Sequence, residues 1–279
     1  MSNSITNHIE PILEIDNLSI SFFTRLREIP AVMDFSCSMK PGEALGLVGE
    51  SGCGKSTVAL GVMQDLGVNG RIVEGTIKFK GQNLNDMSSR ELQKIRGSEI
   101  AMIYQEPMAS LNPSMRIAQQ LMEVPSIHEG LSKTDAYQRA LEVVNDVKLP
   151  DPERILNSYP HQLSGGMKMR LSLARSLVLD PKYILLDEPL SAVDELTREV
   201  LQEELHSMWT RDKFTAILVT HNIAEAVYLS NRVVVMSPRP GKITDIIDIP
   251  FKKRTPDIRS KPQFSKLVND IAGKLRTWK

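Results

Sequence analysis

Residues 49–57 read Gly49-Glu50-Ser51-Gly52-Cys53-Gly54-Lys55-Ser56-Thr57. The run matches G-x-x-x-x-G-K-[ST], a pattern in which glycines let backbone N–H groups turn inward around a chain of phosphates. Residues 43–48 before it have the composition of a short buried strand, and residues 57–63 after it that of a helix start. This order points the positive end of a helix at the phosphates. We therefore expect residues 49–57 to bind a nucleoside triphosphate.

Two side chains of this loop have expected roles. Lys55 is placed to reach the β- and γ-phosphates, and the Ser56 hydroxyl is placed for Mg²⁺. The backbone does most of the binding in such a loop, so the thiol of Cys53 is interpreted as incidental. The alternative is a glycine-rich turn that matches by accident, and it does not explain the strand before the loop or the helix after it.

The composition is that of an ordinary globular protein. The chain has 279 residues, of which 41% are hydrophobic and 24% charged, which indicates one large domain or a core with an inserted subdomain. The 34 basic and 34 acidic residues cancel, so bulk charge gives no sign of nucleic-acid binding, and we expect no nucleic-acid partner. The two cysteines, Cys37 and Cys53, are too few for a disulfide framework and indicate a reducing compartment.

Neither a membrane span nor a signal peptide is expected. No apolar run reaches the roughly 18 to 20 residues that cross a bilayer. The first eight residues are neither basic nor apolar. We therefore expect a cytoplasmic chain that meets membranes only through partners.

Apolar runs predict the strands. Two strands, 12–15 and 18–22, are expected on either side of an Asp16-Asn17 turn, followed by strands at 75–79 and 100–104. Runs without alternation at 183–186, 216–219 and 233–236 fit strands covered on both faces, as in a parallel sheet.

The rest of the pattern divides the chain. A helical stretch with turn signals predicts an inserted subdomain at 106–179, between core segments 1–105 and 180–250. In the tail, 251–279, we expect a final amphipathic helix with an apolar face. The basic tail residues are interpreted as a solvated surface. The apolar positions of the helix are Phe264, Leu267, Val268 and Ile271, and the basic cluster before them is Lys252, Lys253, Arg254, Arg259 and Lys261.

Asp187 and Glu188 follow the buried run 183–186 directly. Ligands in open α/β sheets collect at the carboxyl ends of strands. Asp187 is placed to hold Mg²⁺, usually through water, and Glu188 to orient or deprotonate the water that attacks the γ-phosphate. Two acids at a buried strand end are rarely structural, because burying unpaired charge is costly.

Leu163-Ser164-Gly165-Gly166 precedes an apolar helical face. Ser164 is predicted to cap the helix, and the two glycines allow close backbone approach. The result is a second helix N-terminus prepared for an anion. By itself Ser-Gly-Gly is a common helix start.

The order of all these motifs adds to their meaning. The chain resembles the ATP-binding-cassette (ABC) ATPase family over roughly residues 12–245. Six motifs of that family occur here in the family's order. They are the phosphate loop (Gly49–Thr57), the glutamine loop (Gln105), the LSGG signature (Leu163–Gly166), the Asp-Glu strand (Asp187-Glu188), the D-loop (Ser191-Ala192-Val193-Asp194) and the switch histidine (His221). The resemblance implies an α/β fold, a P-loop NTPase (RecA-like) core with an antiparallel β subdomain and an inserted α-helical subdomain.

The resemblance also implies roles for single residues. Two cassettes would pair head to tail with ATP between the Lys55 loop of one copy and the signature of the other. Glu188 would polarise the attacking water, His221 would contact the γ-phosphate, and Gln105 would reach the metal and the water. Phe22 would stack on adenine, with Phe23 as a rival. The implied nucleotide-binding set is Phe22, residues 49–57, Ser164, Gly165, Gly166 and Asp194, and the implied metal set is Ser56, Gln105 and Asp187.

The implied cofactors are ATP and Mg²⁺. The implied partners are transmembrane permease subunits, a second cassette that is identical or paralogous, and, indirectly, an extracytoplasmic solute-binding protein. The expected place is the cytoplasmic face of the inner membrane, as a peripheral subunit. A soluble ABC protein of ribosomes usually carries two cassettes in one chain, and this chain has one. The related DNA-repair ATPases insert long coiled coils between phosphate loop and signature, and the stretch from Lys55 to Ser164 is too short for them. An ordinary phosphate-loop kinase would not explain the signature, the D-loop or His221.

Two importer groups are represented in the sequence. Residues 50–56, 104–113 and 159–167 look like ATPases of oligopeptide, dipeptide and nickel importers. Residues 187–198, 221–229, 236–241 and the Phe264 tail are more similar to nitrate, sulfonate and taurine importers, and the peptide group's cysteine-bearing extension does not follow. Met167 replaces the glutamine that often ends the signature. We expect an importer with peptide- or nickel-type cargo, and a nitrate- or sulfonate-type importer is the alternative.

Overall fold

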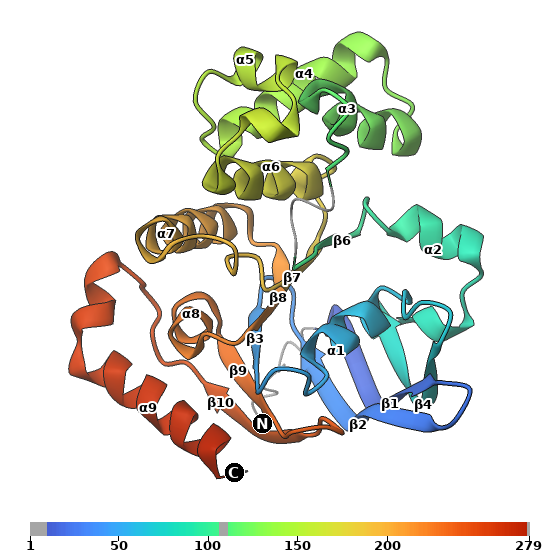
Figure 1. Ribbon diagram of the computed structural model, residues 1–279, viewed down its shortest axis with the longest axis vertical. Helices are drawn as coiled ribbons and strands as arrows, with labels where there is room; N and C mark the ends of the chain where they lie inside the picture. Colours follow the sequence, from blue (N-terminus) through green and yellow to red (C-terminus); the bar gives the residue numbers. More distant parts are fainter. Residues whose placement is uncertain (1–9, 106–110, 278–279) are drawn as a thin grey trace, which may run out of the picture.

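A six-stranded sheet forms the centre of the computed structural model, which describes residues 10–105 and 111–277 (Figure 1). Its strand order is β10-β9-β3-β8-β7-β6, and every pair is parallel except β9 with β10. The strands are β3 (Ala44–Val48), β6 (Ile100–Ile103), β7 (Tyr183–Asp187), β8 (Thr215–Thr220), β9 (Arg232–Met236) and β10 (Ile243–Asp248). The predicted parallel sheet of unalternating apolar runs is confirmed.

The two faces of this sheet belong to two hydrophobic clusters, which explains why its strands do not alternate in sequence. In β7, Ile184 and Leu186 pack into one cluster together with the helical subdomain and the last helix. Tyr183 and Leu185 pack into the other, against the first helix and the antiparallel sheet. Both faces are dry, so each successive position favours an apolar residue.

The second sheet is antiparallel and has the order β2-β1-β4-β5. Its strands are β1 (Leu13–Phe23), β2 (Glu28–Met39), β4 (Gly70–Phe79) and β5 (Gln82–Asn83). The prediction of two strands joined by an Asp16-Asn17 turn is wrong, because β1 is continuous and its register shifts between Ile15 and Leu18. Asn17 has φ 48°, and its N–H donates to Ser36 Oγ at 2.8 Å. Pairing with strands on both sides holds the irregular residues in the sheet as a bulge.

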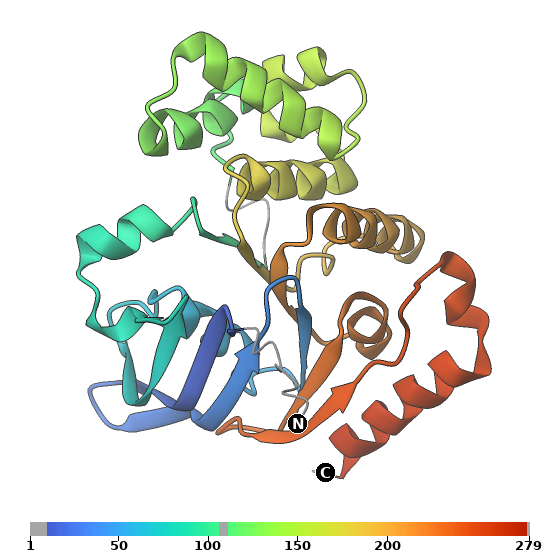
Figure 2. The same ribbon diagram turned by 180° about the vertical axis from the view of Figure 1, so that it is seen from behind.

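The helices form two groups. Around the sheets lie α1 (Lys55–Val62), α2 (Ser89–Ile95), α7 (Glu195–Asp212), α8 (Ile223–Leu229) and α9 (Pro262–Arg276), with short 3₁₀ helices η1 (Leu84–Asp86) and η3 (Pro256–Ser260). The inserted subdomain holds α3 (Ile117–His128), α4 (Lys133–Asp146), α5 (Pro152–Asn157), η2 (Pro160–Gln162) and α6 (Gly165–Leu177). Figures 1 and 2 show α3, α4 and α5 stacked beyond α6, at the end of the molecule away from the antiparallel sheet. The exact domain boundaries stay a prediction.

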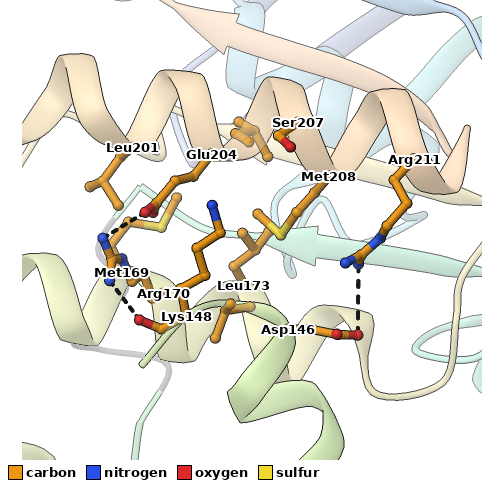
Figure 3. Close-up of a pocket in the computed structure, with 12 residues that line it drawn as sticks. Asp146, Lys148, Met169, Arg170, Leu173, Leu201, Glu204, Ser207, Met208 and Arg211 are labelled. Atoms are coloured by element: carbon orange, nitrogen blue, oxygen red, sulfur yellow. Dashed lines mark hydrogen bonds and ion pairs between the residues drawn. The ribbon is translucent and has the colours of Figure 1, made fainter. Parts of the chain in front are cut away.

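The helical subdomain is joined to α7 by polar contacts around a small cavity of about 40 Å³ (Figure 3). From α6, the Arg170 guanidinium donates to Glu204 of α7 and to the Lys148 carbonyl, both at 2.9 Å. Arg211 of α7 lies 3.7 Å from Asp146 of α4. Arg170 and Glu204 are mostly shielded from solvent, whereas Arg211 and Asp146 are both about half exposed. Arg170 is therefore the stronger of the two links.

The tail confirms one prediction and corrects another. Phe264 and Ile271 are buried on one face of α9, so the final amphipathic helix is confirmed. The basic residues are not all solvated, because Arg254 is 7% exposed and donates to the Ser230 carbonyl. Arg259 stacks on the Tyr228 ring with 3.8 Å between guanidinium carbon and ring centroid. Aromatic rings that belong to α7 and α8 attract both cations. The pattern of charges in the tail sequence does not reveal these rings. Among the described residues, no helix combines the length and apolar character needed to cross a membrane.

Candidate nucleotide-binding site

The predicted phosphate loop lies between the end of β3 and the start of α1. Gly52 and Gly54 have φ angles of 76° and 108°, which L-residues rarely adopt. Gly54 also lies against β2, because a Cβ there would be 2.7 Å from the Ala31 carbonyl oxygen and 2.9 Å from Val32 Cγ2. The loop therefore needs glycine at this position for two reasons, its backbone conformation and its close approach to β2.

Lys55 closes the loop from inside. Its side chain is buried, and Nζ donates to the carbonyl oxygens of Gly49 and Glu50 at 3.0 Å each. Cys53 is also buried, and burial raises the pKa of its thiol. A buried, protonated thiol is unreactive, which agrees with an incidental role. The Lys55 ammonium group is held where the oxygens of a bound phosphate would replace the two carbonyls as its hydrogen-bond partners.

Ser56 and Asp187 meet at the start of α1. Ser56 Oγ donates to Asp187 Oδ1 at 2.8 Å, and Asp187 is 5% exposed. Burial raises the pKa of Asp187, and the Ser56 hydrogen bond and the Lys55 charge oppose that shift. A hydroxyl and one carboxylate are the oxygen ligands that Mg²⁺ takes when phosphates and water complete its shell. The pair fits the expected metal, which would also stabilise the buried negative charge.

Three strand ends place the remaining polar residues together. Glu188 follows β7, His221 follows β8 and Gln105 follows β6. His221 Nδ1 lies 3.0 Å from Glu188 Oε2, and Gln105 Nε2 donates to the same oxygen at 3.4 Å. This edge of the sheet can hold a water between an acceptor and two neighbouring polar groups.

The backbone of Glu188 has an unusual conformation, which no pattern in the sequence predicts. Its φ is 47°, a left-handed conformation that costs an ordinary residue about 1–2 kcal/mol. The Glu188 N–H donates to the Val219 carbonyl of β8 at 2.9 Å, which holds the turn. Such conformations persist where neighbours fix them, and they cluster at functional sites. The turn directs the carboxylate toward His221.

The signature lies beside the D-loop of the same chain. Ser164 caps α6 by accepting the Met167 N–H at 3.4 Å, as predicted. A Cβ on Gly166 would be 3.2 Å from Thr197 Cγ2, and Asp194 caps α7 by accepting the Thr197 N–H at 3.0 Å. Figures 1 and 2 show α6 at the base of the helical subdomain and α1 beside the antiparallel sheet. Ser164, Gly165 and Gly166 at the start of α6 thus lie beside the end of α7 that Asp194 caps, while α6 lies apart from α1, which begins at Lys55.

Two further expectations concern stacking on adenine and the importer-like run. Phe22 is half-buried, and its ring lies against Gly70, where a Cβ would be 3.0 Å from Phe22 Cε1. Phe23 is 36% exposed. Stacking of either ring on adenine stays a prediction. Residues 106–110 of the importer-like run 104–113 lie outside the described residues.

Sequence reasoning missed one residue near this site. Glu225, in the first turn of α8, is 3% exposed and contacts Thr220 beside His221. A glutamate at a helix start is ordinary in sequence, so only the burial distinguishes it.

Comparisons with known proteins identify the family of this chain. A family profile described as "ABC transporter" matches residues 32–191. The dipeptide transport ATP-binding protein DppD of Lactococcus lactis is 40% identical over 81% of this chain, which spans 65% of that protein. The oligopeptide transport ATP-binding protein OppD of Salmonella typhimurium is 36% identical over 85% of the chain, which spans 71% of that relative.

Solved structures show the same fold. A dimeric structure of a post-hydrolysis state of the ATP-binding cassette MJ0796 bound to ADP and Pi has a TM-score of 0.74 and 26% identity, covering 86% of this chain and 99% of that one. The cbiO1 structure from Clostridium perfringens, at 23% identity and a TM-score of 0.73, covers 95% of this chain and 97% of its own and supports the fold alone. The expected fold class is confirmed, and this chain is an ATP-binding ATPase domain of the ABC transporter family.

Proposed function

We propose that the chain is the ATP-hydrolysing motor subunit of an ABC importer. The observation that carries the proposal is the meeting of Ser56 with Asp187, and of Glu188 with His221 and Gln105, at one edge of the sheet. A metal ligand pair beside a water-orienting carboxylate is what hydrolysis of a bound triphosphate needs.

The residues divide the work of hydrolysis. Backbone N–H groups of the phosphate loop bind the phosphates, and Lys55 Nζ exchanges its carbonyl partners for phosphate oxygens. When bound at Ser56 and Asp187, Mg²⁺ supplies charge neutralisation. Glu188 accepts a proton from, or orients, the attacking water, and His221 contacts the γ-phosphate.

A complete site takes two cassettes. The phosphate loop and Ser164 lie on different parts of this chain, so the signature reaches a nucleotide only from a second cassette, either another copy or a paralogue. The dimeric cassette among the solved relatives supports this arrangement. ATP then adds contacts to the closed pair and hydrolysis removes them, which shifts the population of the closed state.

The proposed cargo is of the peptide type. Relatives named for dipeptide and oligopeptide transport support this choice. The proposed partners are transmembrane permease subunits at the cytoplasmic face of the membrane and, through them, a solute-binding protein. The nitrate- or sulfonate-type importer remains the second candidate, favoured by the sequence after Asp187. A soluble ABC ATPase outside transport is the third.

The Glu188→Gln variant tests the hydrolytic role. We expect it to bind ATP with near wild-type affinity while its turnover falls by roughly 10² to 10⁴, since the amide that replaces the carboxylate cannot take a proton from the water. Phosphate release gives the rate, and nucleotide titration gives the affinity. The Lys55→Ala variant is the contrast, because it should weaken nucleotide binding itself. Wild-type turnover in Glu188→Gln would refute the assigned role.

Capture from native membranes tests the transport role. The tagged chain is solubilised gently, and its companions are identified by mass spectrometry. Two multi-spanning proteins and a solute-binding protein would support an importer, and the binding protein can then be titrated with peptides, nickel, nitrate and sulfonates. Recovery with ribosomes or DNA alone would overturn the transporter proposal and leave the ATPase.

A further inference from the structure

Glu225 is a buried acid that the proposed mechanism does not use. It is 3% exposed, and its Oε2 accepts a hydrogen bond from the Thr220 hydroxyl. The other oxygen, Oε1, is shielded from solvent and has no hydrogen-bond partner among the described residues. An ionised carboxylate is costly in such a place, whereas a neutral acid is tolerated.

Glu225 closes a small network around His221. The Thr220 hydroxyl that donates to Glu225 also accepts the Asn222 N–H at 3.0 Å. The Asn222 side chain in turn accepts the Glu225 N–H at 3.1 Å. The residues on both sides of His221 are therefore tied to Glu225 and to each other. The His221 side chain itself is 62% exposed, so packing does little to hold it.

The charges near Glu225 act on its pKa in both directions, and burial outweighs them. They come from Arg198 of α7, His221 after β8 and Glu188 after β7. Arg198 directs its N–H groups to the Leu190 and Val193 carbonyls and to Glu195. Burial raises the pKa of Glu225 to about 7, although Thr220, Arg198 and His221 oppose the shift.

We infer that Glu225 is a positioning residue for ATP hydrolysis, which fixes the turn carrying His221 through Thr220 and Asn222 without an ionic contact. The inference rests on the proposed function, because it assigns Glu225 to the same site. Its effect reaches the reaction only through His221. A group misplaced by about an ångström can cost up to 10²-fold in rate, so a loosened turn has a measurable consequence.

Three variants distinguish the effects of the shape of the Glu225 side chain, of its charge and of its hydrogen bond with Thr220. Glu225→Ala removes the acceptor of Thr220, and we expect kcat to fall roughly 10- to 100-fold while KM for ATP changes less than about twofold. Glu225→Gln keeps the shape and the acceptor without charge, so it should retain near wild-type kcat. Thr220→Val should reproduce the Glu225→Ala loss, and the double variant should be no slower than either single one.

The His221→Ala background distinguishes positioning from general damage. If Glu225 acts through His221, then Glu225→Ala adds no further loss of kcat in that background. Multiplied losses, an unchanged kcat in Glu225→Ala, or a Glu225→Gln variant as slow as Glu225→Ala would each overturn the inference.

Hydrogen exchange separates the inference from the proposed function. The Asn222 and Glu225 N–H groups should exchange faster in Glu225→Ala than in the wild type, and Glu225→Gln should stay protected. A wild-type chain that hydrolyses no ATP would refute the proposed function, while the exchange rates would still report whether Glu225 holds the turn. Equal exchange rates of these N–H groups in the wild type and both variants would refute the inference that Glu225 holds the turn.

Discussion

The two glycines of the phosphate loop with positive φ have different surroundings. A Cβ on Gly52 would meet no atom within 4 Å, whereas one on Gly54 would collide with the backbone and side chain of β2. Gly52→Ala should therefore cost only the conformational term, about 1–2 kcal/mol. Gly54→Ala adds a backbone clash and should cost clearly more, at least about 2 kcal/mol. Urea unfolding of both variants measures the difference, and equal losses would contradict the close approach.

At the scale of single residues, the sequence predicted the contacts that a local motif determines. Lys55 and Ser56 follow a loop whose backbone geometry sets their positions, so their roles could be predicted from spacing. The left-handed turn at Glu188 and the dry oxygen of Glu225 could not, because both depend on which strand ends meet in space. Local patterns carry no information about that meeting.

At the scale of elements, Arg170 joins the helical subdomain to α7. Arg170→Ala leaves the Lys148 carbonyl and the Glu204 carboxylate without their donor, so we expect the free energy of unfolding to fall by about 1.5–3 kcal/mol. Arg211→Ala is the matched control on the same surface (Figure 3), because its pair with Asp146 is longer and exposed. That change should cost less than about 1 kcal/mol. Similar losses in the two variants, measured by urea unfolding, would contradict the link.

A second element-scale prediction concerns His206 of α7, which lies between Trp209 and Tyr228. Burial, with the charges of Arg254 and Lys213, lowers its pKa from 6.5 to about 4. Between these values the unfolded chain binds a proton that the folded chain does not, so stability falls as the pH drops from 6.5 toward 4. His206→Phe removes the part of this pH dependence that comes from His206. Urea unfolding at several pH values should show the wild type losing stability relative to the variant on acidification, and parallel profiles would contradict the shift.

The elements themselves were predictable where all the residues that form a pattern lie close together in the sequence. The unalternating runs that became β7, β8 and β9 and the apolar face of α9 are of this kind. The Asp16-Asn17 pair has good turn composition, yet pairing with β2 and β4 keeps it within one strand. Arg254 appears solvated in sequence, and the aromatic ring that attracts it belongs to α7, far back along the chain.

At the scale of the whole molecule, the phosphate loop and the signature occupy separate parts of one chain. The helical subdomain carries Ser164 and Gly166, and the core carries Lys55 (Figures 1 and 2). If two copies pair head to tail, each composite site takes its loop from one copy and its signature from the other. The expected geometry makes a prediction about mixtures of defective chains.

A Lys55→Ala chain and a Gly166→Asp chain should each be nearly inactive alone, since every homodimer site lacks one half. A mixed dimer holds one site in which both halves are intact and one in which both are defective. Random pairing at equal concentrations makes about half of the dimers mixed, so roughly a quarter of wild-type ATPase activity should return. The rate of phosphate release against mixing ratio should peak at equal amounts. An inactive mixture would exclude pairing of this chain with itself in an active head-to-tail dimer and favour a paralogous cassette as the partner.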